Sequence, residues 1–261
     1  MNQYWHWQTG QQYSYLTCDI LSNWQHGFFS QQSYPQTPEH LTSILQPQTT
    51  AFRVKQIHGN LVLIPQEITE QLDRQDYTKE LAEADAVMSN NSEQSVWAAS
   101  ADCTPILIGD LNTGRVCAIH AGWRGTAQKI VAGAIARFVE FGGQKADLRI
   151  AIGPAISGGM YQVDESVAIE VGRSIVTDFV EERDILDKLQ QLPNSPVLED
   201  ESLGKVRLDV PRVNQIQLEQ LGLEPEQIAI APYCTFKDSD RFFSYRRTGE
   251  KKVQWSGIVA N

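Results

Sequence analysis

The chain has 261 residues, of which 41% are hydrophobic and 21% are charged, the balance of an ordinary globular protein. Its formal net charge of −10 opposes contact with the phosphates of nucleic acid, so we expect no nucleic-acid partner. No apolar run approaches the roughly 18 to 20 residues of a membrane span, and no membrane partner is expected. The N-terminal segment shows no basic stretch followed by an apolar core, so we expect no signal peptide and a cytoplasmic location with reduced cysteines.

Short strands are predicted along much of the chain. Residues 31–50 are rich in Gln, Pro and Thr and predict a surface excursion with at most a short helix near 40–45. Short apolar runs after this segment predict strands, and the polar residues and glycines between them predict turns. The strands are expected at 61–64, 86–88, 96–99, 105–108, 116–119, 148–152 and 228–231.

The clearest helical pattern covers 126–141, where paired apolar residues recur every four positions and form one buried stripe. Thr126 is the expected N-cap of this helix, and Gly142 is its expected stop. A second helix is expected over 165–180, with its apolar residues on one face.

A third helix is predicted to start at Asp209 as its cap, with Pro211 in the first turn, and to end at Gly222. The acidic, proline-broken segment 181–204 predicts a solvated insertion. Strands and helices mix without strict βαβ alternation. We therefore expect a single α+β domain over 1–261, with mixed β-sheets flanked by helices.

Cys103 and His120 flank two consecutive predicted strands. Cys103 lies in SADCTPILIG just before the first strand, and His120 closes the second strand, VCAIH, after the turn GDLNTGR. If the two strands pair as a hairpin, the start of the first lies beside the end of the second. A thiolate and an imidazole would then meet at one sheet edge, which suits either a Cys–His nucleophile or two ligands of a soft-metal site.

His58 offers a third ligand. Apolar and polar residues alternate in FRVKQIHGN and predict a strand that ends at His58 and Gly59, where the glycine lets another group approach closely. Two histidines and a cysteine with an open fourth position are the pattern of a catalytic zinc site, which lowers the pKa of bound water toward about 7. The sequence therefore predicts one zinc ion per chain, rather than copper, held by His58, Cys103 and His120.

The loop after His120, AGWRGT, adds a predicted anion site. Its two glycines permit a tight turn, and the N–H groups at the start of the next helix face the same space. Arg124 offers a fork of donors suited to phosphate or carboxylate. Arg124 and Asp102, the acid that precedes Cys103, are the candidate catalytic residues.

Further residues are candidates for contact with a substrate. Trp123 can stack on a planar ring, as can Tyr161 in the glycine-rich loop AIGPAISGGMYQV. Asp85 precedes a strand, where it either supports a ligand or makes a turn. Arg53 stands five residues before the QIHG histidine, an odd separation that puts the two on opposite faces of a strand unless a bulge intervenes. The candidate substrate-binding residues are Arg53, Asp85, Trp123, Tyr161 and Arg246.

Together, KQIHGN, ADAV, ADCTPIL, HAGWRGT, IGPAIS and FFSYRR resemble the YfiH-type laccase-domain family, once called polyphenol oxidases and now regarded as purine nucleoside phosphorylases. The resemblance implies a single α+β domain and a metal held by the QIHG histidine, the ADC cysteine and the HAGWRG histidine, here His58, Cys103 and His120. In one place the chain departs from the family. Gln31 and Gln32 follow HGFFS, where family members often carry an arginine and a pair of glycines.

The resemblance also implies phosphorolysis of adenosine, inosine and S-methyl-5′-thioadenosine to base plus (methylthio)ribose 1-phosphate, together with deamination of adenosine to inosine. The expected partners are therefore purine nucleosides and phosphate. The alternatives are a metal-free Cys–His hydrolase or deamidase and a zinc-stabilised binding protein without turnover. A copper-dependent polyphenol oxidase is disfavoured, because five histidines are too few for a multicopper centre.

Overall fold

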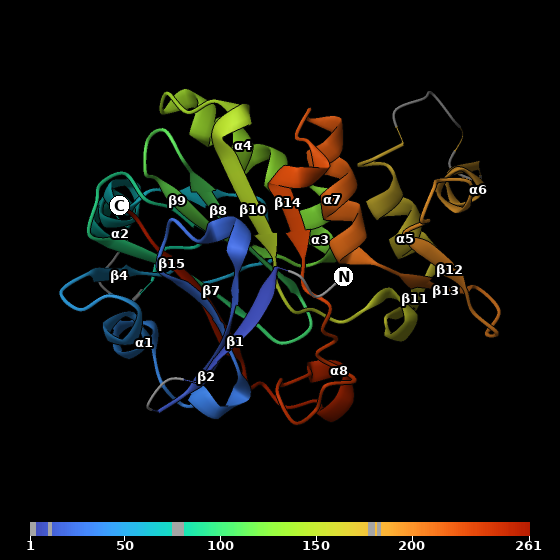
Figure 1. Ribbon diagram of the computed structural model, residues 1–261. Helices are drawn as coiled ribbons and strands as arrows, with labels where there is room; N and C mark the ends of the chain where they lie inside the picture. The colour runs from blue at the N-terminus through green and yellow to red at the C-terminus, as the bar shows by residue number, and fades with distance from the viewer. Residues whose placement is uncertain (1–3, 10–11, 75–80, 177–180, 182–183) are drawn as a thin grey trace.

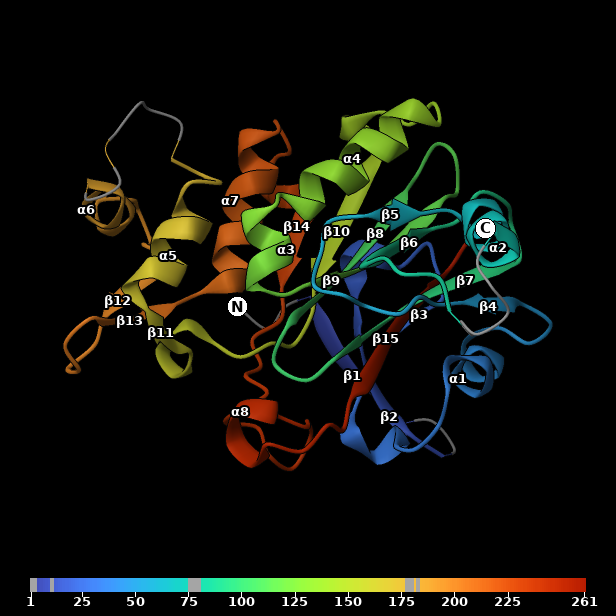
Figure 2. The same ribbon diagram turned by 180° about the vertical axis from the view of Figure 1, so that it is seen from behind.

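Two six-stranded sheets lie face to face, and a three-stranded sheet stands at one end of the molecule (Figures 1 and 2). Helices cover the outer faces of the large sheets. The expected fold class, α+β with mixed sheets flanked by helices, is confirmed. The computed structural model describes residues 4–9, 12–74, 81–176, 181 and 184–261.

The three sheets draw their strands from distant parts of the chain. The first sheet has the order β1 (Trp5–Thr9), β2 (Ser14–Cys18), β3 (His26–Phe29), β15 (Gln254–Val259), β7 (Gln94–Ser100) and β4 (Thr50–Phe52). The second has the order β14 (Ile228–Ile230), β10 (Leu148–Ile152), β8 (Thr104–Asp110), β9 (Val116–Ala121), β6 (Ala86–Met88) and β5 (Val62–Leu63). The third has the order β11 (Gln162–Asp164), β13 (Lys205–Leu208) and β12 (Val197–Glu199).

The hairpin of β8 and β9 forms the middle of the second sheet. Both strands are buried along their whole length, which explains their continuous apolar runs, because each face of this sheet is covered. The strands pair antiparallel, with Thr104 opposite Ala121 and Pro105 opposite His120. The hairpin predicted from the sequence is therefore confirmed, and it brings the start of β8 beside the end of β9.

Each layer boundary has its own apolar core. Leu16 and Phe28 of the first sheet meet Leu107 and Ala118 of the second, which seals the two large sheets together. On the other face of the second sheet lie α4 (Ile130–Glu140) and α7 (Val210–Gln220). The outer face of the first sheet is covered by α1 (Pro38–Leu45). Two further helices are α2 (Pro65–Arg74) and, near the C-terminus, α8 (Tyr245–Thr248).

Segment 31–50 is more than the predicted surface excursion. Its helix α1 covers the predicted 40–45 and buries Leu41 and Leu45. These side chains pack in one cluster with Trp97, because the first sheet presents an apolar outer face that needs a cover.

The single helix predicted over 126–141 is two helices, α3 (Trp123–Ala127) and α4 (Ile130–Glu140). Lys129 separates them with φ +59, in the left-handed region. Thr126 is therefore not an N-cap. It is fully buried inside α3, and its hydroxyl accepts a hydrogen bond from Asn214. The apolar period could not show the buried place of Thr126, because its partner Asn214 lies 88 residues away.

The helices predicted at 165–180 and from Asp209 are both present, but their bounds were predicted with different accuracy. α7 (Val210–Gln220) begins as predicted, and the Asp209 carboxylate accepts the N–H of Arg212 at 3.0 Å. α5 (Glu165–Gly172) ends earlier than predicted, where the Ser174 hydroxyl donates to the carbonyl of Val171 and competes with helix continuation. Residues 177–180 of this prediction lie outside the described chain.

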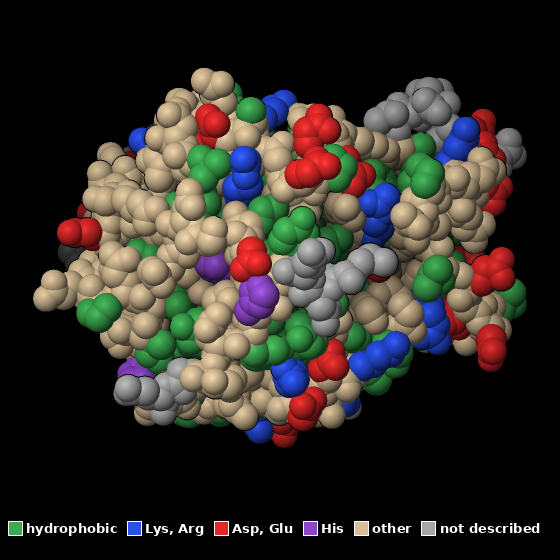
Figure 3. Space-filling view, in the orientation of Figure 1, with side chains coloured by type: hydrophobic (Ala, Val, Ile, Leu, Met, Phe, Trp, Pro, Cys, Tyr) green, Lys and Arg blue, Asp and Glu red, His purple; other side chains and the backbone are tan. Residues whose placement is uncertain are grey.

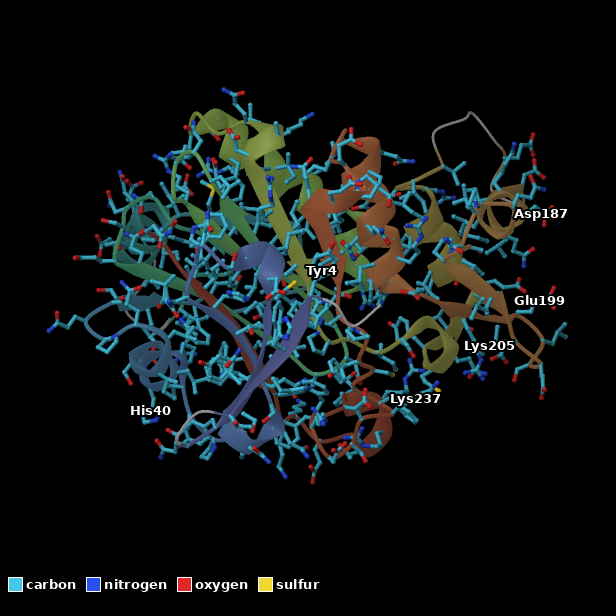
Figure 4. All side chains as sticks on the ribbon, in the orientation of Figure 1. Tyr4, His40, Asp187, Glu199, Lys205 and Lys237 are labelled. Carbon is cyan, nitrogen blue, oxygen red and sulfur yellow. The ribbon has the colours of Figure 1, made fainter. Side chains whose placement is uncertain are left out.

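The prediction of a solvated insertion at 181–204 was wrong. This segment supplies β12 and α6 (Ile185–Gln190), which close over an apolar cluster with α5, β11 and β13. We call this unit the small lobe. The segment's residues buried in the cluster are Ile185, Leu189 and Val197. Figure 4 shows the charged side chains of Asp187 and Glu199 in this segment pointing outward. Acidic composition therefore described only the outer face of the lobe.

The described surface agrees with the balance of charges in the sequence. Figure 3 shows acidic and basic side chains interspersed over one face, without a continuous basic patch among the described residues seen there. Across the part of the chain that the structure describes, no helix has the length and apolar character needed to cross a membrane.

His26 is a buried, neutral histidine in β3. Its Nε2 accepts the N–H of Cys18 at 2.8 Å, so its Nδ1 carries the proton and donates to the carbonyl of Trp24 at 2.9 Å. Burial lowers the pKa of this imidazole below its usual value. Protonation of Nε2 would remove the acceptor that Cys18 uses.

We expect the stability of the protein to fall as pH drops below about 6.5, the pKa of an unfolded histidine. In this range the unfolded state binds more protons at His26 than the native state, so the free energy of unfolding rises with pH. The contribution is at most about 1.4 kcal/mol per pH unit. Urea unfolding of the wild type and of His26→Gln between pH 5.5 and 7.5 measures it. The exposed His6 provides the control His6→Gln, and parallel profiles for all three proteins would contradict the prediction.

Candidate active site

The hairpin places Cys103 and His120 at the same sheet edge. Cys103 stands directly before β8, and His120 lies in β9 opposite Pro105. The side chain of His120 is buried, while Cys103 is only partly buried and reaches the edge of a pocket. The spacing argument from the sequence therefore corresponds to a real juxtaposition.

His58 reaches the same place from a loop. The strand predicted to end at this residue was wrong: β4 stops at Phe52, and only a single bridge from Lys55 to Glu83 follows. The backbone of His58 has φ +61, a left-handed conformation incompatible with a strand. Gln56 ties the loop to the first sheet, because its amide both donates to and accepts from the backbone of Ala99.

Asp85 joins this loop to β9. One carboxylate oxygen accepts the N–H of His58 and Nδ1–H of His120, both at 2.9 Å. The other oxygen accepts the N–H of Gly59 at 2.6 Å and of Ile57 at 3.2 Å. Three successive amides thus converge on one buried carboxylate, a nest that holds the left-handed turn. Asp85 leaves Nε2 of His120 free to act as a ligand.

His58, Cys103 and His120 offer one ligand atom each, and these atoms lie within 4.8 Å of one another. The two imidazole rings meet edge to face. Gly122 stands directly against the cluster, since a Cβ there would lie 3.1 Å from Sγ of Cys103 and 3.2 Å from Cδ2 of His58. The glycine therefore keeps the space between the ligands open. A cluster of one thiolate and two imidazoles can bind a metal ion such as zinc or copper.

The cluster also shifts the pKa values of its members. Burial raises the pKa of the Cys103 thiol, but hydrogen bonds with His120 and His58 and their positive charge outweigh burial and hold the pKa at about 6. Burial lowers the pKa of His120, and hydrogen bonds with Asp85 and Cys103 overcome it and raise the pKa to about 9. The pair favours the thiolate, the form that ligates metals and attacks electrophiles.

A pocket of about 320 Å³ opens beside the cluster, a size within the range of small-molecule sites. Several parts of the chain surround it: the His58 loop, the ends of β8 and β9, α3, the segment before β11, the start of α7 and the C-terminal segment. Its walls combine apolar and charged side chains. The lining residues outside the cluster are Ala101, Asp102, Thr104, Ala121, Gly122, Trp123, Arg124, Ile156, Tyr161, Val210, Tyr245 and Arg246.

Two arginines of the pocket are each stacked on an aromatic ring. The guanidinium of Arg124 lies 4.2 Å from the ring centroid of Trp123, and that of Arg246 lies 4.9 Å from the ring of Tyr161. Arg246 also donates from Nη1 to the carbonyl of Gln162 at 2.9 Å. Burial raises the pKa of Tyr161 to about 12, so its phenol stays protonated near neutrality. These stacked pairs leave donors available to an anion in the pocket.

Asp102 is held by the C-terminal segment. One carboxylate oxygen accepts the hydroxyl of Thr235 at 2.6 Å, and the other accepts the N–H of Arg246 at 2.7 Å. The backbone of Asp102 has φ +89, a rare conformation for a residue with a side chain. Such conformations persist where surrounding contacts impose them and concentrate at functional sites.

Three residues singled out from the sequence lie away from the pocket lining. Arg53 pairs with Glu39 at 3.5 Å and lies over the ring of Trp255. Asp85 is buried behind His120 rather than in the pocket wall. Gln31, at the position where the family often has arginine, donates to the carbonyl of Ser239 at 2.9 Å.

Sequence reasoning missed several residues of the site. Val210 and Ile156 form apolar wall, Tyr245 stands at the rim, and Thr235 holds Asp102 across 133 residues of chain. Val210 and Thr235 carry no local signal, because each lies in a segment whose place is set by tertiary packing. The motifs IGPAIS and FFSYRR, which contain Ile156 and Tyr245, gave the hints for the other two.

A family model described as multi-copper polyphenol oxidoreductase laccase matches residues 36–260. The purine nucleoside phosphorylase slr1573 of Synechocystis sp. is 51% identical to this chain over 258 residues, 98% of this chain and 97% of the relative. Adenosine deaminase RL5, from an unknown prokaryotic organism, is 27% identical over 195 residues, 75% of this chain and 69% of the relative. The crystal structure of Bacillus licheniformis hypothetical protein YfiH superposes with a TM-score of 0.77 at 22% identity, covering 98% of this chain and 99% of that one.

We expect Asp85→Asn to lower the affinity of the cluster for zinc by roughly 10- to 100-fold, because the amide cannot accept from all the donors that the carboxylate serves. Asp110 provides a matched control, as a buried carboxylate that accepts loop amides at the far end of β8. Both variants should unfold at lower urea concentration, whereas only Asp85→Asn should lose metal in a competition titration with a chelator. Equal affinities for zinc in the two variants would contradict the role given to Asp85.

Proposed function

This chain belongs to the YfiH-type laccase-domain family, and on that premise we propose that it is a zinc-dependent purine nucleoside phosphorylase. The observation that carries the proposal is the convergence of His58, Cys103 and His120 on the pocket that Arg124 and Arg246 border. A soft-metal site and an anion site within one pocket suit a reaction in which phosphate is a substrate. The relative that is 51% identical is named a purine nucleoside phosphorylase, which supports the same reaction.

Arg124 and Arg246 are proposed to bind the attacking phosphate. Among the described residues, neither guanidinium pairs with a carboxylate, although the protein as a whole is acidic. Their stacking on Trp123 and Tyr161 restricts the side chains before the anion arrives, which reduces the ordering cost of binding. Guanidinium groups match the oxygens of phosphate with two parallel hydrogen bonds.

The remaining walls are proposed to hold the nucleoside. Apolar Ile156 and Val210 can bury the faces of base and sugar, while Trp123 and Tyr161 provide rings for stacking. Asp102 keeps lone pairs that its two partners do not use and can accept a hydrogen bond from the substrate. When bound by the cluster, zinc would supply Lewis-acid polarisation. We propose adenosine, inosine and S-methyl-5′-thioadenosine as substrates, with deamination of adenosine as a second activity.

The same residues support a second candidate, a metal-free Cys–His hydrolase or deamidase. The observation in its favour is the position of the Cys103 sulfur beside the imidazole of His120, with the ligand atoms of the cluster within 4.8 Å of one another, an arrangement that favours the thiolate. Chelation separates the candidates, because a thiol enzyme keeps its activity in a chelator and loses it to iodoacetamide.

The free cysteines and the acidic charge fit a cytoplasmic enzyme whose partners are small molecules rather than nucleic acid.

The purified protein should carry about one zinc per chain and should release hypoxanthine from inosine only when phosphate is present. Removal of the metal by a chelator should abolish this release, and zinc should restore it. Chromatography of the base and of ribose 1-phosphate measures the reaction. Release without phosphate would defeat the proposal, as would full activity of the metal-free protein.

Arg124→Met should raise the KM for phosphate by about 10- to 100-fold, the loss expected for hydrogen bonds to a charged group. Arg149→Met provides the control, because the guanidinium of Arg149 donates to backbone carbonyls of its own strand start, away from the pocket. Initial rates at varied phosphate and saturating inosine measure both variants. An unchanged KM in Arg124→Met would remove this residue from the phosphate site.

A further inference from the structure

Helix α3 carries Trp123 and Arg124, and buried polar side chains of α7 donate hydrogen bonds to it. Asn214 donates from Nδ2 to the hydroxyl of Thr126 at 3.0 Å, and Gln217 donates from Nε2 to the carbonyl of Thr126 at 2.8 Å. Asn214 is 0% exposed and Gln217 is 3% exposed. Figures 1 and 2 both show α3 lying alongside α7, and these two amides join them near the buried end of α3.

The contacts continue into two other parts of the fold. The amide of Gln217 also donates to the hydroxyl of Ser174, just after α5, at 2.7 Å. The amide of Asn214 also donates to the carbonyl of Val210 at 2.9 Å. Val210 begins α7 and lines the pocket, as do Trp123 and Arg124 of α3. The amide of Asn214 therefore binds both α3 and the first residue of α7, and both of these elements line the pocket.

Stability alone does not account for these amides. A buried amide contributes little net free energy once its hydrogen bonds to water are replaced, and apolar packing serves the neighbouring contact between α4 and α7. Hydrogen bonds differ from apolar contacts in fixing one relative position of two helices. α3 also needs such support, because it has only 5 residues and Gly122 gives it no side-chain cap.

We propose that Asn214 and Gln217 are positioning residues, which act through Thr126 to set Trp123 and Arg124 at the edge of the pocket. This inference rests on the proposed function for its kinetic consequence, since α3 holds the phosphate-binding arginine. Neither amide touches the pocket itself, so their loss should weaken phosphate binding while the metal cluster stays intact. The small lobe contributes through Ser174, which couples its position to that of α3.

Two variants test the proposal and two control for it. Gln217→Met removes the amide and keeps the length of the side chain. Thr126→Val removes the hydroxyl that Asn214 uses, whereas Thr126→Ser keeps it and should rescue the effect. The second control is Gln220→Met, because Gln220 lies on the same helix and donates to the carbonyl of Ile175 rather than to α3.

Gln217→Met and Thr126→Val should raise the KM for phosphate about tenfold, with kcat and zinc content within twofold of wild type. Hydrogen exchange of the α3 amides should become faster in these variants, while exchange in α4 stays unchanged. Gln220→Met and Thr126→Ser should match the wild type in both measurements. Wild-type KM and exchange in Gln217→Met and Thr126→Val would overturn the proposal, as would an equal KM increase in Gln220→Met. If the wild type lacks phosphorolysis, the proposed function fails, and the exchange rates of α3 alone decide whether the amides position this helix.

Discussion

The site depends on one buried carboxylate. Asp85 accepts hydrogen bonds from the N–H of His58 and of its two neighbours, and from the imidazole of His120. It thereby fixes one ligand through the backbone and another through the side chain. A left-handed turn at His58 and a chosen tautomer at His120 both follow from its two oxygens. The convergence of ligands from a loop and a strand is possible because β6, which follows Asp85, pairs with β9.

The pocket lies where elements from several distant parts of the chain meet. Strand ends of the second sheet supply the thiol and the buried imidazole, α3 and the small lobe supply aromatic rings, and the C-terminal segment supplies Arg246. A loop contact that spans 133 residues, between Asp102 and Thr235, closes the arrangement. Polar contacts thus decide the geometry of the site, whereas apolar clusters decide the stability of the layers around it.

The contrast between the sheets explains which parts of the fold were predictable. Strands of the second sheet are covered on both faces, so they show continuous apolar runs and were predicted with nearly correct bounds. The first sheet was mostly missed. Its strands β1, β2, β3 and β15 mix aromatic, polar and glycine residues, because each meets a different environment on its two faces. The small lobe was missed for a related reason, since its apolar residues are spread thinly between charged ones.

The sequence by itself predicted that Cys103 and His120 meet at one sheet edge, because a short turn between their strands leaves a hairpin as the simplest pairing. The order of the motifs indicated the family and added His58 to the proposed metal site. The sequence also determined the cap of α7 at Asp209, which is a local interaction. Only the tertiary structure decided that Asp85 orients His58 and His120, that Thr126 is buried against Asn214, and that Arg53 lies over Trp255. The reason is that each of these outcomes rests on a partner distant in the chain, and hydrogen bonds or packing across such distances leave no period or spacing in the local sequence.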